Sequence, residues 1–111
     1  MPFNSEAKVT ARGRRYHLVA TDYESVDVGA APARFTQAKI DASDGVEVYF
    51  SAGPVRIFFH GLDPSATVGI EVFDGGFREF GKTGAGLLRA VRSGPTNGTM
   101  MAVYFSARDD A

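Results

Sequence analysis

The fold is decided by residues 46–60, which read VEVYFSAGPVRIFFH. Apolar residues alternate with polar or aromatic ones on both sides of Ala52-Gly53-Pro54. This period of two is typical of β-strands that each bury one face. We predict a hairpin with Ala52-Gly53 at its tip, in which the core face fixes the register and sets Phe50 opposite Val55. The buried face of this hairpin would consist of Val46, Val48, Phe50, Val55, Ile57 and Phe59.

The opposite face of the predicted hairpin is less polar than a solvent-exposed face should be, because it carries Tyr49 and Phe58 beside Arg56 and His60. A strand predicted near the C-terminal end is apolar on both faces, and Tyr104 lies on one of them. Such faces are buried by a second sheet, by loops or by another subunit. The candidate ligand-binding or interface residues are therefore Tyr49, Arg56, Phe58, His60 and Tyr104.

Short β-branched and aromatic runs recur along the whole chain and are separated by Gly, Pro, Asp or Asn. We predict an all-β fold, a single domain over residues 1–111 built as an antiparallel β-sandwich or a jelly-roll-like barrel. Strands should exceed about 40% of the residues, and no helix should be longer than two turns. Asn97-Gly98 predicts a second hairpin with a type I′ turn. The predicted strands are 15–21, 34–42, 46–51, 55–60, 67–73, 77–81, 86–91 and 99–107.

Composition narrows the classes of function. The 12 basic and 13 acidic residues leave a net charge of -1, which attracts neither nucleic acid nor an anionic membrane. Cysteine is absent, which excludes disulfides, thiolate zinc sites and a catalytic thiol. No leader or membrane span is recognised in the sequence, so a soluble, cytoplasmic protein is expected.

Residues 76–83, GFREFGKT, fit the pattern of a phosphate-binding loop, in which backbone N–H groups would wrap phosphates and Lys82 would reach them. Phe77 and Phe80 are bulky where such a loop must approach the phosphates closely, and a single strand remains to build a parallel sheet. We interpret the segment as a hairpin turn at residues 74–76 followed by an edge strand that leaves Lys82 exposed.

Other chemistry-bearing residues lack the spacing of a site. His17 and His60 belong to no metal or nucleophile motif. The acidic residues at 41–45 and 22–27 resemble calcium loops but are typical of turns. The basic cluster of Arg12, Arg14, Arg15 and His17 could bind phosphate, although an exposed edge strand carries the same residues. We predict no metal and no cofactor.

The sequence predicts a non-enzymatic interaction or assembly module that forms a homo-oligomer, most simply a two-fold dimer, through an apolar sheet face. One alternative is a small carbohydrate-binding or other ligand-binding domain, which would present a small-molecule or sugar platform. A second alternative is a small enzyme that uses His60 or His17. The aromatic platform would comprise Tyr49, Phe58, Phe73 and Tyr104.

Overall fold

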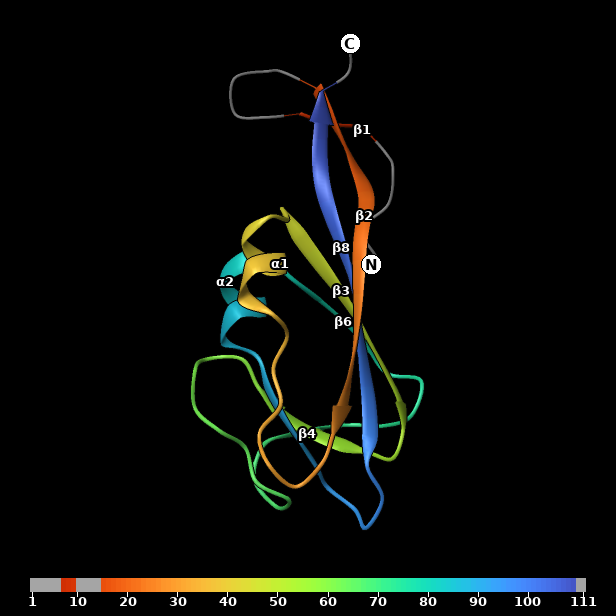
Figure 1. The fold of residues 1–111 in the computed structure, drawn as a ribbon, viewed down its shortest axis with the longest axis vertical. Helices are drawn as coiled ribbons and strands as arrows, with labels where there is room; N and C mark the ends of the chain where they lie inside the picture. Colours follow the sequence, from red (N-terminus) through yellow and green to blue (C-terminus); the bar gives the residue numbers. More distant parts are fainter. Residues whose placement is uncertain (1–6, 10–14, 110–111) are drawn as a thin grey trace.

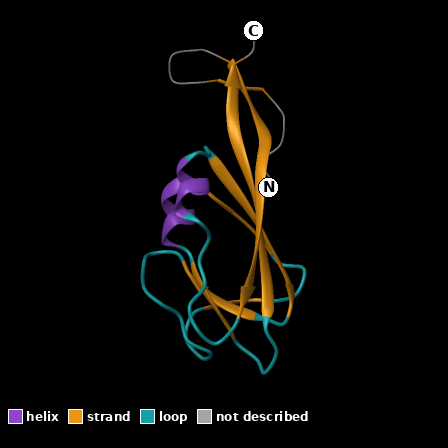
Figure 2. Cartoon of the chain, in the orientation of Figure 1, coloured by secondary structure: helices purple, strands orange, loops and turns teal. Residues whose placement is uncertain are grey.

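The chain folds into two antiparallel sheets, with 51% of the residues in strands and 12% in helices (Figures 1 and 2). The computed structural model describes residues 7–9 and 15–109, and for residues 7–9, 15, 16 and 109 it describes the backbone. The predictions of an all-β fold and of more than 40% strand are confirmed. Within the described part of the chain, no helix is long and apolar enough to cross a membrane.

The larger sheet has five strands and the smaller has three. In spatial order the larger sheet consists of β1 (Ala7–Val9), β2 (Arg15–Val28), β8 (Gly98–Asp109), β3 (Gly45–Ala52) and β6 (Phe77–Phe80). The smaller sheet consists of β5 (Ile70–Val72), β4 (Val55–Phe58) and β7 (Arg89–Arg92). The helices α1 (Gln37–Asp41) and α2 (Lys82–Leu87) have 5 and 6 residues, as the sequence predicted for helices of at most two turns.

The core lies between the two sheets and under the two helices, which cover one side of the larger sheet (Figure 1). Val48 on β3 and Ile57 on β4 are both fully buried, and Ile40 of α1 joins the same cluster. The alternating residues of β3 and β4 therefore face each other across the core. Burial of their apolar surface is the main source of stability for such a layered fold.

The long strands β2 and β8 form a ribbon that extends beyond the rest of the molecule and gives it extents of 50 × 23 × 21 Å (Figure 1). The register between these strands shifts between Ala20 and Asp22, so Thr21 is an extra residue in β2. Its hydroxyl bonds to the carbonyl oxygen of Tyr104 at 3.4 Å. This β-bulge bends the ribbon where it leaves the body of the domain.

The prediction of a hairpin at residues 46–60 is wrong. β3 pairs with β6 and β8, whereas β4 pairs with β5 and β7 in the other sheet. The chain turns between the sheets at Ala52, which has a φ of 69°, and at Gly53, where a Cβ would lie 2.8 Å from the carbonyl oxygen of Thr96. Strands in which apolar and polar residues alternate bury the same apolar residues in either arrangement: side by side in one sheet, or in two sheets that face each other across a core. Five of the six predicted core residues are thus buried, and Phe59, just beyond β4, is 45% exposed.

Three further predictions of local structure are wrong. Residues 37–41 form helix α1 within a predicted strand, since Gln37, Ala38 and Lys39 have good helix propensity. Residues 86 and 87, also predicted as strand, close helix α2. The Asn97-Gly98 pair does not make a hairpin, because β7 and β8 belong to different sheets.

Candidate interaction surface

The side of the larger sheet that faces away from the helices, here called the outer face, carries two rows of mostly apolar side chains. Partners in register lie on the same side of a sheet, so the pairing of β6, β3, β8 and β2 defines these rows. The first row is Phe77, Tyr49, Met101 and Ser25. The second row is Glu79, Glu47, Val103 and Tyr23.

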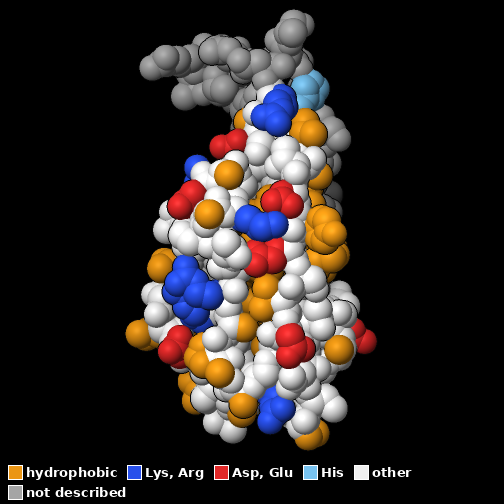
Figure 3. All heavy atoms as spheres, viewed as in Figure 1, with side chains coloured by type: hydrophobic (Ala, Val, Ile, Leu, Met, Phe, Trp, Pro, Cys, Tyr) orange, Lys and Arg blue, Asp and Glu red, His pale blue; other side chains and the backbone are white. Residues whose placement is uncertain are grey.

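Several of these side chains are accessible to solvent. Tyr23 is 67% exposed, and Tyr49 and Met101 are each 39% exposed. Phe77 is half-buried and packs on Tyr49 with ring centroids 5.0 Å apart. Hydrophobic atoms gather along the right flank of the space-filling view, on the side of the sheet away from the helices (Figure 3). The outer face is therefore the broad apolar surface that the larger sheet leaves uncovered by any described helix or sheet.

A carboxylate lies in the middle of this face. Glu47 is only 3% exposed, and its Oε1 atom accepts a hydrogen bond of 2.6 Å from the hydroxyl of Tyr49. Its Oε2 atom is buried and has no hydrogen-bond partner. The hydrogen bond to Glu47, together with burial and the negative charges of Glu47 and Glu79, raises the pKa of Tyr49 to about 12.

The outward face of the smaller sheet is covered by the chain itself. The Arg56 guanidinium donates hydrogen bonds of 3.0 Å to the carbonyl oxygens of Ala66 and Gly69, which pins the loop between β4 and β5. Gly69 has a φ of 136° and a Cβ there would lie 3.2 Å from the carbonyl oxygen of Ile57 on β4, so the loop packs closely on this sheet. Val91, the neighbour of Arg56 on β7, is only 2% exposed. Arg56 is thus a structural residue that holds a loop.

The structure does not bring the five predicted site residues together. Tyr49 lies on the outer face, whereas Arg56, Phe58 and His60 lie on or beside the smaller sheet. Phe58 is half-buried and stacks on the exposed His60, with ring centroids 4.7 Å apart. Tyr104 is 1% exposed and belongs to the core. Tyr49 is the one member of this set that lies on the outer face.

Tyr104 connects the core to a polar cluster at the edge of the sheet. Its hydroxyl donates a hydrogen bond of 2.9 Å to Glu24, which also accepts bonds from the backbone and the hydroxyl of Thr36. Burial disfavours the ionised form of Glu24, but these hydrogen bonds outweigh it and lower its pKa. Desolvation and the bond to Glu24 raise the pKa of Tyr104. Glu24 therefore ties β2 and β8 to the start of α1.

The predicted aromatic platform is not assembled. Tyr49, Phe58 and Tyr104 lie on three different faces, and Phe73 is 64% exposed at the turn that follows β5. On the outer face, the rings of Tyr49 and Phe77 are tilted by 49°. A sugar ring stacks on a flat aromatic surface, which this pair does not provide.

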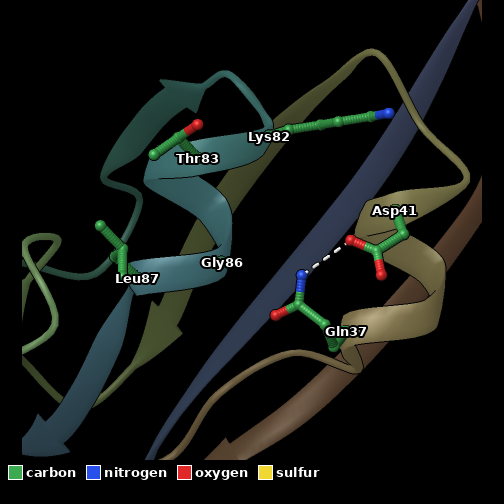
Figure 4. A pocket seen from close by; sticks show the side chains of 6 residues that line it. All are labelled: Gln37, Asp41, Lys82, Thr83, Gly86 and Leu87. Carbon is green, nitrogen blue, oxygen red and sulfur yellow. Dashed lines mark hydrogen bonds between the residues drawn. The ribbon is translucent and has the colours of Figure 1, made fainter.

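A pocket of about 320 Å³ lies between the two helices (Figure 4). Lys82 and Thr83 of the phosphate-loop pattern line it with Asp41 and Gln37, whose amide donates a hydrogen bond of 2.9 Å to Asp41. None of these four side chains is buried. Residues 77–80 form strand β6 paired with β3, so their backbone does not wrap around a phosphate. The edge strand and the exposed Lys82 agree with the sequence interpretation, but the predicted hairpin turn at residues 74–76 is wrong, because β5 and β6 belong to different sheets.

The acidic segments that resembled calcium loops have structural partners. Asp22 forms an ion pair of 3.1 Å with Lys39, and Asp44 accepts a hydrogen bond from the backbone of Ala107. Among residues 7–9 and 15–109 no group of three or more acidic or histidine side chains could hold a metal ion. Arg12 and Arg14 of the basic cluster lie outside the described residues.

A second group of exposed apolar residues lies in and beside the loop between β4 and β5, at the lower left of the space-filling view (Figure 3). Unlike the outer face, it belongs to one loop and one edge strand of three residues. It includes Leu62, which is 66% exposed. The members are Phe59, Leu62, Val68, Ile70 and Phe73.

Comparison with known protein families, with curated proteins and with solved structures gave no match. Sequence reasoning did not select Tyr23, Phe77 and Met101 as site residues. The alternation of Met101, Val103 and Phe105 along the last strand contained part of the signal, but strand order was needed to place β2 and β3 beside it and β6 beside β3.

Proposed function

We propose that this protein is an assembly module that forms a two-fold homodimer through the outer face of its five-stranded sheet. The observation that supports this most strongly is the exposure of Tyr23, Tyr49 and Met101 on one continuous face of the larger sheet. Contiguous apolar patches of this kind on soluble proteins mark interaction sites. The proposal keeps the self-association predicted from the sequence and moves it to a different face.

The face has the layout of a protein interface. Aromatic residues, methionine and the buried Glu47 occupy its middle, and beside them lie Ser25, Ser51, Thr99 and Asp27 on β2, β3 and β8. Interface cores are enriched in aromatic residues and methionine, and their rims are polar. Two such sheets can pack face to face at about 10 Å, as the sheets of a single domain do.

A second copy of the chain is an occupant that the overall charge permits. A net charge of -1 produces little repulsion between two identical chains. A two-fold contact requires only one self-complementary surface, and the outward face of the smaller sheet is already covered by the loop that Arg56 holds.

The test is the mass in solution, measured by light scattering after gel filtration. We expect twice the chain mass of 11.9 kDa for the natural protein. Met101→Glu should give the monomer, because it introduces a carboxylate at the centre of the face without disturbing the core. Leu62→Glu places the same charge on the exposed apolar loop and should leave the dimer intact.

A natural chain that is monomeric at every accessible concentration would contradict the proposal. Dissociation by Leu62→Glu but not by Met101→Glu would move the interface to the loop between β4 and β5. Circular dichroism of both variants shows whether each retains its strands, so that unfolding is not mistaken for dissociation.

A further inference from the structure

Glu47 is a buried carboxylate with incomplete hydrogen bonding. It is 3% exposed, and its Oε2 atom has no hydrogen-bond partner. The other carboxylates near the sheets are paired: Glu24 accepts bonds from Thr36 and Tyr104, and Glu71 binds Ser93 and Arg56. Glu47 therefore differs from the acidic residues that have a structural role.

Burial of an unpaired carboxylate is unfavourable, because the hydration free energy that it loses is offset only by hydrogen bonds or by an opposite charge. The hydroxyl of Tyr49 satisfies one oxygen of Glu47. On β6, the residue opposite Glu47 is another acid, Glu79, which adds negative potential at this point. The local field thus favours the arrival of a positive charge.

The chemistry of the surroundings selects the kind of cation. The rings of Tyr49 and Phe77 stand beside the carboxylate in the neighbouring row, with centroids 5.0 Å apart. Aromatic faces attract ammonium and guanidinium groups and also accept the aliphatic stem of a long basic side chain. A divalent metal would require six or more oxygen ligands, and among the described residues no group of three or more acidic or histidine side chains could hold a metal ion.

We propose that Glu47 is the binding site for the cationic head of a lysine or arginine side chain that a docking protein lays against the rings of Tyr49 and Phe77. The ammonium or guanidinium group donates to Oε2, and the aromatic rings contact the stem. The cation can displace the Tyr49 hydroxyl from Oε1, because a charge-assisted hydrogen bond is stronger than one from a neutral hydroxyl. Tyr49 is 39% exposed and has room to move outward.

The test uses the full chain and N-acetyl-L-argininamide as the probe, with backbone amide signals followed by nuclear magnetic resonance. We expect saturable shifts at Glu47, Tyr49 and Phe77. N-acetyl-L-citrullinamide, which is neutral and has nearly the same shape, should cause none. Glu47→Gln keeps the shape of the side chain and should weaken binding of the probe at least about tenfold, since a charged hydrogen bond is worth more than 1.4 kcal/mol.

The matched control is Glu71→Gln. Glu71 is also a half-buried sheet carboxylate, but it already has Arg56 as a partner, so this variant should bind the probe as the natural chain does. Equal binding by Glu47→Gln and the natural chain would overturn the proposal. A response to magnesium ions and not to the arginine probe would also overturn it.

The solution mass, measured on the same samples, separates this proposal from the proposed dimer. A monomer that binds the probe at Glu47 supports the cation site and contradicts the dimer. In a dimer that excludes the probe, dissociation by Glu47→Gln would show that the second copy supplies the cation. A dimer that neither binds the probe nor responds to Glu47→Gln contradicts the cation site alone, whereas a monomer that ignores the probe contradicts both proposals.

Discussion

The hydrogen bond between Tyr49 and Glu47 is short, at 2.6 Å, and links the two most informative residues of the outer face. It is the largest cause of the raised pKa of Tyr49, which is about 12. Glu47→Ala removes both the acceptor and the charge, so we expect the pKa of Tyr49 to fall toward its ordinary value of 10. A pH titration followed by tyrosinate absorbance measures this, with Tyr49→Phe identifying the contribution of Tyr49.

The sign of the effect on stability follows from the same pKa. Because folding raises the pKa of Tyr49, the stability that its hydroxyl contributes is fully present below pH 10 and is lost as the pH rises through about 12. Glu47→Ala should remove this dependence from that pH window. If the alkaline titration of the variant matches that of the natural chain, the bond between Tyr49 and Glu47 does not exist in solution.

A substitution of the single residue Ile57 tests the core. Its side chain is fully buried between the two sheets, so Ile57→Ala should lower the free energy of unfolding by about 2–5 kcal/mol. Phe59→Ala is the control, since Phe59 is 45% exposed and should cost less although its side chain is larger. Urea denaturation measures both values. A greater loss for Phe59→Ala would place Phe59 in the core, as the sequence had predicted.

The alternation in residues 46–60 was sufficient to identify five of the buried residues, because burial depends on which side of a strand a residue occupies. The same alternation left Glu47 unremarkable, since it occupies a position that reads as solvent-exposed. Its neighbours in the sheet, Glu79 and Val103, come from distant parts of the sequence through the pairing of β3 with β6 and β8.

The loop between β4 and β5 is the element whose position depends on a single side chain. Arg56 holds the carbonyl oxygens of Ala66 and Gly69, and Arg56→Met keeps the aliphatic stem while removing both donors. We expect faster hydrogen exchange across residues 61–69 and a loss of about 1.5–3 kcal/mol in the free energy of unfolding. Exchange followed by mass spectrometry measures the first and denaturation the second.

The control for the loop is Arg34→Met, because the guanidinium of Arg34 bonds to the exposed Gln37 at 2.8 Å and holds no loop. This variant should leave exchange at residues 61–69 unchanged. If hydrogen exchange at residues 61–69 is equal in Arg56→Met and in the natural chain, then packing of Pro64 against Gly69, and not Arg56, holds the loop in place.

At the scale of elements, local patterns predicted strands better than their partners. β3, β4 and β6 lie within or close to their predicted ranges. Their pairing could not be predicted, because the turn at Ala52-Gly53-Pro54 can close a hairpin or lead the chain into another sheet, and contacts with Thr96 decide between the two. The strand β2 continues through residues 22–28 in its pairing with β8, and Asp22 and Glu24 there bond to Lys39 of α1 and to Thr36 just before that helix.

At the scale of the whole molecule, the fold class followed from composition and turn spacing, but the free surface did not. Each sheet has one face in the core, and the sequence indicated correctly that apolar residues also lie on the other faces. The structure shows that a loop covers one of these faces and that no described helix or sheet covers the other. The strand order therefore changes the proposed interface from the face that carries Phe58, on the smaller sheet, to the outer face that carries Met101.

Transfer of magnetisation between subunits is the most direct test of the outer face as the dimer interface. Chains with isotope-labelled methionine methyl groups are mixed with unlabelled chains, and only contacts between different chains are recorded. The methyl group of Met101 should show contacts to aromatic protons of the second copy, whereas Met100, fully buried in the core, should show none. A dimer in which the methyl group of Met101 shows no contact to the second copy would contradict the outer face as the interface. So would a dimer in which only the methyl group of Met100 shows such a contact.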